Sequence, residues 1–240
     1  MAAPELTPRL QLVPVARIRF NEHPEHRRTF RLVERIKEEM TLRNPPIVAE
    51  IEGEAFLLLD GANRVGAFRE LGFSHVPVQV VDYGDDRIEL KGWHHLLVNG
   101  RSLALRSAYE QIPGVRLEQI APEKLTEVLE QRAVYAVLVD ETTACWALWP
   151  PKPPEAVAVG ERIAVLEQVV GGYEGQSKLE RVKLADFSQL PEVIRTVEHQ
   201  LCLFPVFHKA ELLNLAAEQV LIPTGLSRHL IPGRALGLNL

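Results

Sequence analysis

The chain of 240 residues is long enough for one large domain or two smaller ones, and its 46% hydrophobic and 25% charged residues are ordinary for a soluble globular protein. Lys and Arg number 27 against 32 Asp and Glu, so the formal net charge is −5. This acidic balance argues against a protein whose main task is non-specific DNA binding, because the DNA backbone is bound by basic surfaces.

The first third of the chain combines short strands with two helices. Residues 10–20 alternate weakly and are rich in β-branched side chains, which predicts a strand. The polar segment 21–28 that follows the strand is expected to be a loop, because Pro24 prevents a helix there. Apolar residues recur on one face from Thr29 until a pair of prolines, which predicts a helix. Pro77 pushes its own strand towards a sheet edge, because proline cannot donate to a neighbouring strand. The other expected elements are a hairpin of strands 47–51 and 55–59, a helix over 62–71 that stops at Gly72, and the strand 76–81.

The second half is less sharply patterned. A proline in the first turn favours a helix over 122–132. The tail from Ile222 to Arg234 concentrates glycine, proline and polar side chains, which favours a shaped loop. The other expected elements are a strand pair at 134–139 and 144–149 and helices at 161–170, 190–200 and 209–219. Hairpin strands mixed with helices predict an α+β fold rather than a doubly wound sheet.

The two cysteines, Cys145 and Cys202, lie far apart and have no Cys-x-x-Cys spacing. They cannot form a disulfide framework or a cysteine-rich zinc site, so we expect reduced thiols and a cytoplasmic protein. No apolar run approaches the roughly 18 residues that span a bilayer, and residues 1–7 lack the basic start and apolar core of a signal peptide.

The most informative stretch of the chain is the turn at residues 60–64. An apolar run ends in Asp60-Gly61 and a helical pattern starts at once, which leaves free backbone N–H groups and the positive end of the helix dipole at one spot. A carboxylate before that spot and Arg64 just inside the helix suit a metal-bound phosphate. The alternative is a plain tight turn in which Asp60 caps the helix and Arg64 forms a surface ion pair.

Five short motifs between residues 12 and 82 point to a known superfamily. They are VPVARI at 13–18, RRTF at 27–30, NPPIV at 44–48, LDGANR at 59–64 and VPV at 76–78. With them, this segment resembles the ParB/sulfiredoxin-like domain. Gly-Trp-His-His at 92–95 and Ser-Arg-His at 227–229 extend the likeness, so the whole chain is similar to the free L-serine kinases of this superfamily. The resemblance implies a ParB/sulfiredoxin-like phosphate-binding domain over 1–98, a second domain of helices and strands over 99–240 that supplies a substrate-binding tail, and an active-site cleft between them.

The turn separates the branches of this superfamily. Sulfiredoxins need a cysteine where Ala62 stands, so the absence of a thiol excludes their sulfur chemistry. Partition proteins carry a Gly-Glu-Arg-Arg turn and a helix-turn-helix module, and the sequence pattern indicates neither. Some of the serine kinases have histidine near Ala62 or Asn63. Asn63 can donate to a phosphate oxygen but cannot titrate near neutral pH.

By this resemblance, the turn handles phosphate. Asp60 holds Mg²⁺ or orders the phosphates, as a catalytic and metal-binding residue. Backbone N–H groups of Gly61, Ala62 and Asn63 bind phosphate oxygens, and the Arg64 guanidinium forms bidentate hydrogen bonds with the phosphate.

The loop after the first strand supplies the expected base. Glu22 stands where the serine kinases carry a catalytic glutamate, and its carboxylate would take the proton of the serine hydroxyl. Glu25 competes for this role, and one of Arg27 and Arg28 is expected to face phosphate. The alternative for Glu22 is an ordinary solvated side chain.

Five residues are expected to contact serine. Trp93 and His94 line the pocket by resemblance, and Ser227, Arg228 and His229 form a clamp in which Arg228 pairs with the substrate carboxylate. The alternatives are a core tryptophan, a structural histidine and a surface tail with chance polar residues. The pair His94-His95 is not expected to bind a metal, because adjacent residues on a strand point apart.

These assignments predict a Mg²⁺-dependent kinase that transfers a phosphoryl group from ATP or ADP to free L-serine, giving O-phospho-L-serine. One alternative is a nucleotide-binding, DNA-associated ParB-like regulator without small-molecule turnover, and another is a kinase for a different small hydroxyl compound. Neither DNA nor a membrane is expected as a partner, and the donor, the pathway and the oligomeric state stay open.

Overall fold

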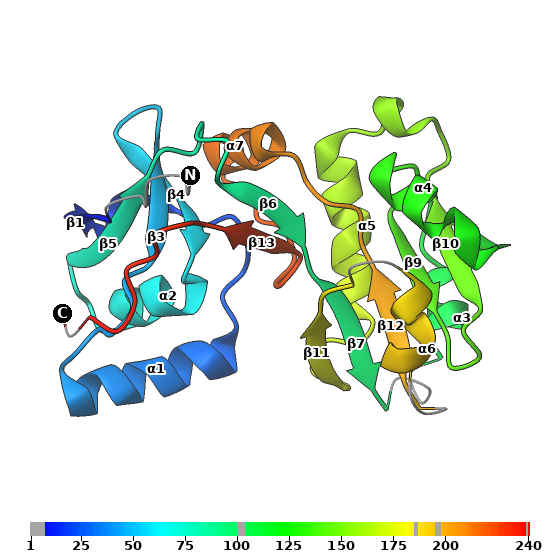
Figure 1. Cartoon of the computed structure of the whole chain (residues 1–240), viewed down its shortest axis with the longest axis horizontal. Coiled ribbons are helices and arrows are strands. Elements are labelled where there is room, and N and C mark those ends of the chain that lie inside the picture. Colours follow the sequence, from blue (N-terminus) through cyan, green and yellow to red (C-terminus); the bar gives the residue numbers. More distant parts are fainter. Residues whose placement is uncertain (1–7, 100–103, 185–186, 195–197, 239) are drawn as a thin grey trace, which may run out of the picture. The chain divides into compact units, whose positions relative to one another are not determined.

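The computed structural model describes residues 8–99, 104–184, 187–194, 198–238 and 240. The chain forms two compact units (Figure 1). The first comprises Met1–Lys91, His208–Thr224 and Arg228–Leu240, and the second comprises Gly92–Phe207 and Gly225–Ser227. The chain leaves the first unit a few residues before the expected boundary at 98, and most of the C-terminal segment returns to it.

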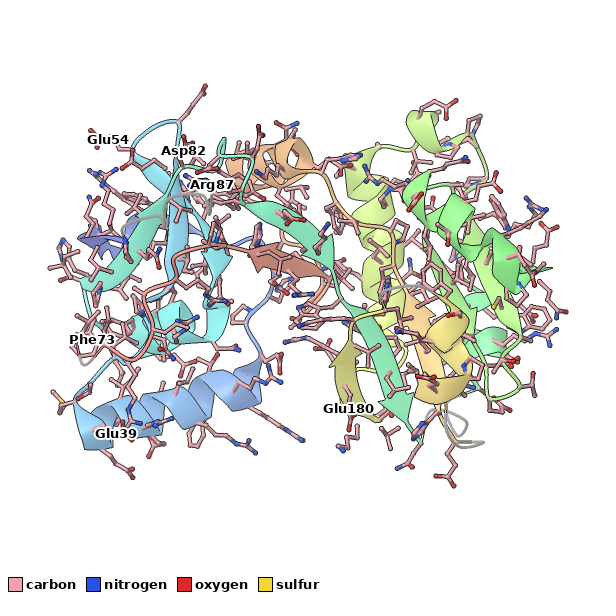
Figure 2. All side chains as sticks on the ribbon, in the orientation of Figure 1. Glu39, Glu54, Phe73, Asp82, Arg87 and Glu180 are labelled. Atoms are coloured by element: carbon pink, nitrogen blue, oxygen red, sulfur yellow. The ribbon has the colours of Figure 1, made fainter. Side chains whose placement is uncertain are left out.

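A five-stranded mixed sheet organises the first unit, in the order β1-β5-β3-β4-β2. The expected hairpin is confirmed, since β3 and β4 pair antiparallel, and β3 pairs parallel with β5 on its other side. Glu54 lies at the tip of this hairpin (Figure 2). The strands are β1 (Arg9–Pro14), β2 (Ile18–Arg19), β3 (Ile47–Ile51), β4 (Ala55–Asp60) and β5 (His75–Val81).

Helices α1 (His26–Glu39) and α2 (Ala62–Glu70) cover one face of this sheet (Figure 1). Val33 and Ile36 of α1 and Val65 of α2 are buried in one cluster with strand residues such as Val48. Burial of such side chains is the main stabilising term of the fold, at about 1.5–3 kcal/mol each. Helix α1 begins three residues before the expected Thr29 and ends at Glu39, ahead of the prolines.

Two expectations for the strands of this sheet are wrong. The strand expected over 10–20 is interrupted by a 3₁₀ turn at Val15–Arg17, which separates β1 from β2. Strand β5 lies between β1 and β3 and is not an edge strand. Pairing of β5 with β3 begins only at Gln79, whose amide donates to the Pro46 carbonyl. Residues two apart on a strand direct their N–H groups to the same side, so Pro77 lacks an N–H at a position that β3 does not reach.

The C-terminal part of the first unit contains helix α7 (Lys209–Glu218), as expected, and strand β13 (Ser227–Leu230). The tail was expected to be a loop, but β13 pairs with β6 (Glu89–Gly92) in a two-stranded sheet. The boundary between the two units falls within both strands, because Gly92 of β6 and Ser227 of β13 are grouped with the second unit.

The second unit is built on a six-stranded antiparallel sheet in the order β11-β7-β12-β9-β10-β8. The expected strand pair is confirmed as β9 and β10. The strands are β7 (His94–Val98), β8 (Arg116–Ile120), β9 (Ala136–Val139), β10 (Cys145–Trp149), β11 (Lys178–Val182) and β12 (Gln200–Leu203).

Helices of the second unit pack against its sheet. The expected helices at 122–132 and 161–170 are confirmed, the first with a 3₁₀ start. The helix expected over 190–200 is wrong, because only Leu190–Val193 is helical and Gln200–Leu203 is strand β12, with 195–197 outside the described residues. The helical elements are α3 (Leu105–Tyr109), α4 (Leu125–Glu130), α5 (Val159–Gly171), α6 (Leu190–Val193) and 3₁₀ turns at Pro122–Lys124, Pro154–Ala156 and Phe187–Gln189.

Together the two units confirm the α+β class. Cys145 and Cys202 are both free and buried. Burial raises the pKa of the Cys145 thiol to about 11 and that of Cys202 to about 12, so both are inert thiols near neutral pH. Within the described residues, no helix has the length and apolar character needed to cross a membrane.

Candidate active site

The turn after β4 has the geometry of an anion site. Gly61 has a φ of 107°, which favours glycine, and it reverses the chain so that α2 starts at Ala62. The amides of Arg64 and Val65 donate to the Gly61 carbonyl at 2.9 and 3.0 Å. The N–H groups of Ala62 and Asn63 have no acceptor among the described residues, so two donors are open at the positive end of the helix.

The Arg64 side chain folds back across this turn. Its Nη2 donates to Asp60 at 2.8 Å, and its Nη1 donates to the carbonyls of Asn44 and Pro45. A Cβ on Gly61 would lie 3.0 Å from the guanidinium, so only glycine leaves it room. The Arg64 side chain, which was expected to bind phosphate, is 17% exposed. It links the turn to the loop that precedes β3.

Asp60 has a second cationic partner that the sequence did not suggest. Its Oδ2 accepts a hydrogen bond from Arg234 as well as from Arg64. We call Asp60, Arg64 and Arg234 the turn triad. Arg234 lies 174 positions further along the chain, and its place beside Pro232 and Gly233 in the unusual tail was the one signal for it.

The loop that carries Glu22 is held next to the turn. Asn63 Oδ1 accepts hydrogen bonds from the Glu25 amide at 2.7 Å and from the Thr29 hydroxyl at 3.2 Å. On the other side, Glu22 forms a β-bridge with Ile222. Glu22 is half-buried in this loop, and the contact of the loop with the turn is made three residues later, at Glu25.

Strand β13 divides the three expected clamp residues between two faces. Ser227 and His229 are buried and Arg228 is half-buried, as alternation along a strand requires. His229 Nε2 and the Tyr83 hydroxyl share a hydrogen bond of 2.8 Å. Burial lowers the pKa of His229 to about 4, although the Leu59 carbonyl and the Asp60 charge act in the opposite sense. His229 therefore lies beside the end of β4, and the turn and the tail meet within the first unit.

Trp93, His94 and Ser227 belong to the second unit. Trp93 donates its backbone N–H to the Leu226 carbonyl at 3.2 Å, and the Lys183 ammonium lies 5.3 Å from the centre of its ring. His94 Nδ1 accepts from the Phe204 amide at 3.2 Å, and burial lowers its pKa to about 4. His94 is therefore a neutral acceptor at pH 7.

His95 is a fully buried structural residue. Its Nε2 lies 2.9 Å from the Gly225 carbonyl, which can only accept, so Nε2 carries the proton and Nδ1 accepts from the Tyr173 hydroxyl at 2.7 Å. Burial lowers the pKa of His95 to about 4. Neighbouring His94 makes different contacts, as expected for adjacent residues on a strand.

The pKa of His95 predicts acid sensitivity of the second unit. A folded-state pKa below the unfolded value of about 6.5 gives a contribution that is complete above pH 6.5 and is lost as the pH falls towards 4. Between pH 7.5 and pH 5, His95 alone should lower the free energy of unfolding by about 2 kcal/mol. Urea unfolding at both pH values measures this loss. H95Q should flatten the slope and H75Q, at an exposed ring, should not; an equal slope in H95Q would contradict the assignment.

No family model matches the chain. It is 28% identical over 120 residues to an ATP-dependent L-serine kinase of Staphylothermus marinus, covering 49% of this chain and 47% of that protein. It is 22% identical over 230 residues to the ATP-dependent L-serine kinase SbnI of Staphylococcus aureus, covering 96% and 81%. A solved structure of a free serine kinase variant in complex with AMP superimposes with a TM-score of 0.79 at 16% identity, over 99% of this chain and 94% of that one. The chain has the fold of the free serine kinases.

The resemblance to the free serine kinase branch is thereby confirmed. The shared fold extends over both units and is not limited to the motifs at 13–78. The first sequence match spans about half the length of the Staphylothermus kinase, whereas the match to SbnI spans nearly all of this chain.

Proposed function

We propose that this protein is a free L-serine kinase that transfers a phosphoryl group from ATP to the serine hydroxyl, giving O-phospho-L-serine and ADP. The observation that carries the proposal is the turn at Asp60–Arg64, where two backbone N–H groups at the start of α2 have no acceptor among the described residues. Relatives named ATP-dependent L-serine kinases and the fold of a free serine kinase support it.

The turn is proposed to bind the transferring phosphate. The N–H groups of Ala62 and Asn63 donate to phosphate oxygens, and the dipole of α2 adds positive potential. Phosphoryl transfer depends mainly on positioning and charge neutralisation, and a turn fixed by Arg64 and Asn63 supplies a preorganised site.

Glu22 is proposed to act as the general base. A serine hydroxyl is a poor nucleophile, so a carboxylate that accepts its proton as the bond to phosphorus forms would accelerate the transfer. The backbone of the loop is held at Asn63 and at Ile222, which fixes the position from which the Glu22 side chain extends.

The donor set at Asp60 fits a Mg²⁺ ion bound mainly through the nucleotide. Among the described residues no group of three or more His, Cys, Asp or Glu side chains could hold a metal. Asp60 Oδ1, however, accepts no hydrogen bond from those residues, so one carboxylate oxygen is open. Magnesium commonly binds one or two carboxylates together with substrate phosphates, and it would neutralise phosphate charge here.

Serine recognition is proposed to use Arg228, whose guanidinium can pair with the substrate carboxylate. Contacts of Trp93, His94, Ser227 and His229 with the amino acid stay predictions of the resemblance. Burial of the His229 ring and its bond to Tyr83 limit that residue to a neutral hydrogen-bonding role near pH 7.

The proposal is tested by incubating the purified protein with L-serine, Mg²⁺ and either ATP or ADP, and detecting phosphoserine by mass spectrometry. We expect phosphoserine with ATP, and less or none with threonine or homoserine as acceptor. A better acceptor than serine would redefine the substrate. Failure to phosphorylate any of them, together with a salt-sensitive mobility shift of DNA, would favour the regulator instead.

A further inference from the structure

The turn triad carries more positive than negative charge. Two guanidinium groups share one carboxylate, so the ion cluster has a net charge of plus one beside the two open N–H groups. A polyphosphate that approaches the turn therefore meets a cationic site, although the protein as a whole is acidic.

The two arginines of the triad are held differently. Arg64 is bound to the carbonyls of Asn44 and Pro45 as well as to Asp60, and its side chain is 17% exposed. Arg234 is bound through its side chain to Asp60, and that side chain is 35% exposed. Moving Arg64 would break the turn, whereas Arg234 can turn towards a ligand and give up a single ion pair.

The backbone beneath Arg234 is fixed although its side chain is exposed. Gln79 is 2% exposed, and its amide donates to the Gly233 carbonyl at 2.9 Å and accepts from the Ala235 amide at 2.8 Å. These bonds lie on either side of Arg234 along the chain. A buried side chain amide with both ends satisfied holds the tail in one register, which aims the guanidinium at the turn.

We propose that Arg234 is the arginine that binds the terminal phosphates of the nucleotide, that Arg64 instead maintains the turn, and that Gln79 positions Arg234. This inference rests on the proposed kinase function and names a residue for it. When the nucleotide binds, Arg234 exchanges the Asp60 carboxylate for phosphate oxygens, which leaves Asp60 Oδ2 bound by Arg64. A guanidinium suits this role because it binds phosphate with two parallel N–H groups.

The decisive experiment compares nucleotides that differ in their terminal phosphates. Dissociation constants of ATP, ADP and AMP are measured by calorimetry for the unaltered chain, R234Q, R234K and R43Q. Arg43 is the matched control, since it forms an exposed ion pair with Glu39 at the far end of α1 (Figure 2). R234Q should weaken ATP binding about tenfold or more and AMP binding hardly at all, with R234K intermediate and R43Q unchanged.

Activity and stability separate the two arginines. R234Q should lower kcat/KM for ATP by about 10²-fold and keep the melting temperature of the unaltered chain, whereas R64K should lower the melting temperature. Q79M should also lower kcat/KM, and adding it to R234Q should cause little further loss, because both act through one guanidinium. Equal losses of ATP and AMP affinity in R234Q, or none, would overturn the proposal. Absence of phosphoserine from the unaltered protein would overturn the proposed function, while the nucleotide comparison would still decide the role of Arg234.

Discussion

Replacing Glu22 with glutamine is expected to lower serine phosphorylation by about 10²- to 10⁴-fold while ATP binding persists. Glutamine keeps the size and hydrogen-bonding capacity of the side chain but cannot accept the proton of the serine hydroxyl. The backbone of Glu22 is held by the bridge to Ile222, so the loop should keep its place in E22Q. Single-turnover phosphoserine formation and ATP calorimetry on the same sample measure the two quantities.

Glu25 provides the matched control for this experiment. It lies in the same loop, and its carboxylate forms an ion pair with Arg28 at 3.0 Å, next to solvent. The bond from its backbone amide to Asn63 is unaffected by a change of side chain. E25Q should therefore keep nearly full activity, because exposed ion pairs contribute at most about 1 kcal/mol. Normal turnover in E22Q with a collapse in E25Q would transfer the role of base to Glu25.

The second large effect is expected at Gly61. An L-residue in the left-handed region costs about 1–2 kcal/mol, and the new Cβ would lie 3.0 Å from a guanidinium that three acceptors hold in place. G61A should therefore lower the free energy of unfolding by about 2–3 kcal/mol, including about 1 kcal/mol for a weakened hydrogen bond of Arg64. Displacement of the open N–H groups should lower kcat/KM by about 10²-fold.

Gly72 separates backbone strain from the clash with Arg64. It follows the other end of α2 with a φ of 74°, and a Cβ there would meet nothing within 4 Å. G72A should show the strain of about 1–2 kcal/mol in urea unfolding and retain activity. If G61A and G72A lose the same stability and both keep normal turnover, Gly61 has no special role in holding Arg64 or in catalysis.

Some local features were correctly predicted because they depend on neighbouring residues. A glycine turn was expected where the apolar run ends in Asp60-Gly61 and a helical pattern begins, and the hairpin and helix on either side of it follow from short-range periodicity. The expected helices over 161–170 and 209–219 were found for the same reason. By contrast, the short apolar run in 190–200 was ambiguous, and pairing of Leu201–Leu203 with β9 decided in favour of a strand.

The position of β5 shows how neighbouring strands override a local signal. Pro77 suggested an edge, yet pairing with β3 starts only at Gln79, so the missing N–H of Pro77 is not needed. The ladder in which a strand takes part is set by the whole sheet, so one residue type cannot decide it.

The sequence by itself determined the α+β class, the glycine turn before α2 and the likeness to free serine kinases. Each of these depends on short sequence segments, whose periodicity or motif is visible without knowledge of distant contacts. Tertiary structure alone decided which arginine is available at that turn. Arg64 and Arg234 have the same guanidinium, and only folding shows that the first is bound by backbone carbonyls while the second is brought from 174 residues away by Gln79. Hydrogen-bond partners so distant along the chain leave no periodic or compositional trace in the sequence.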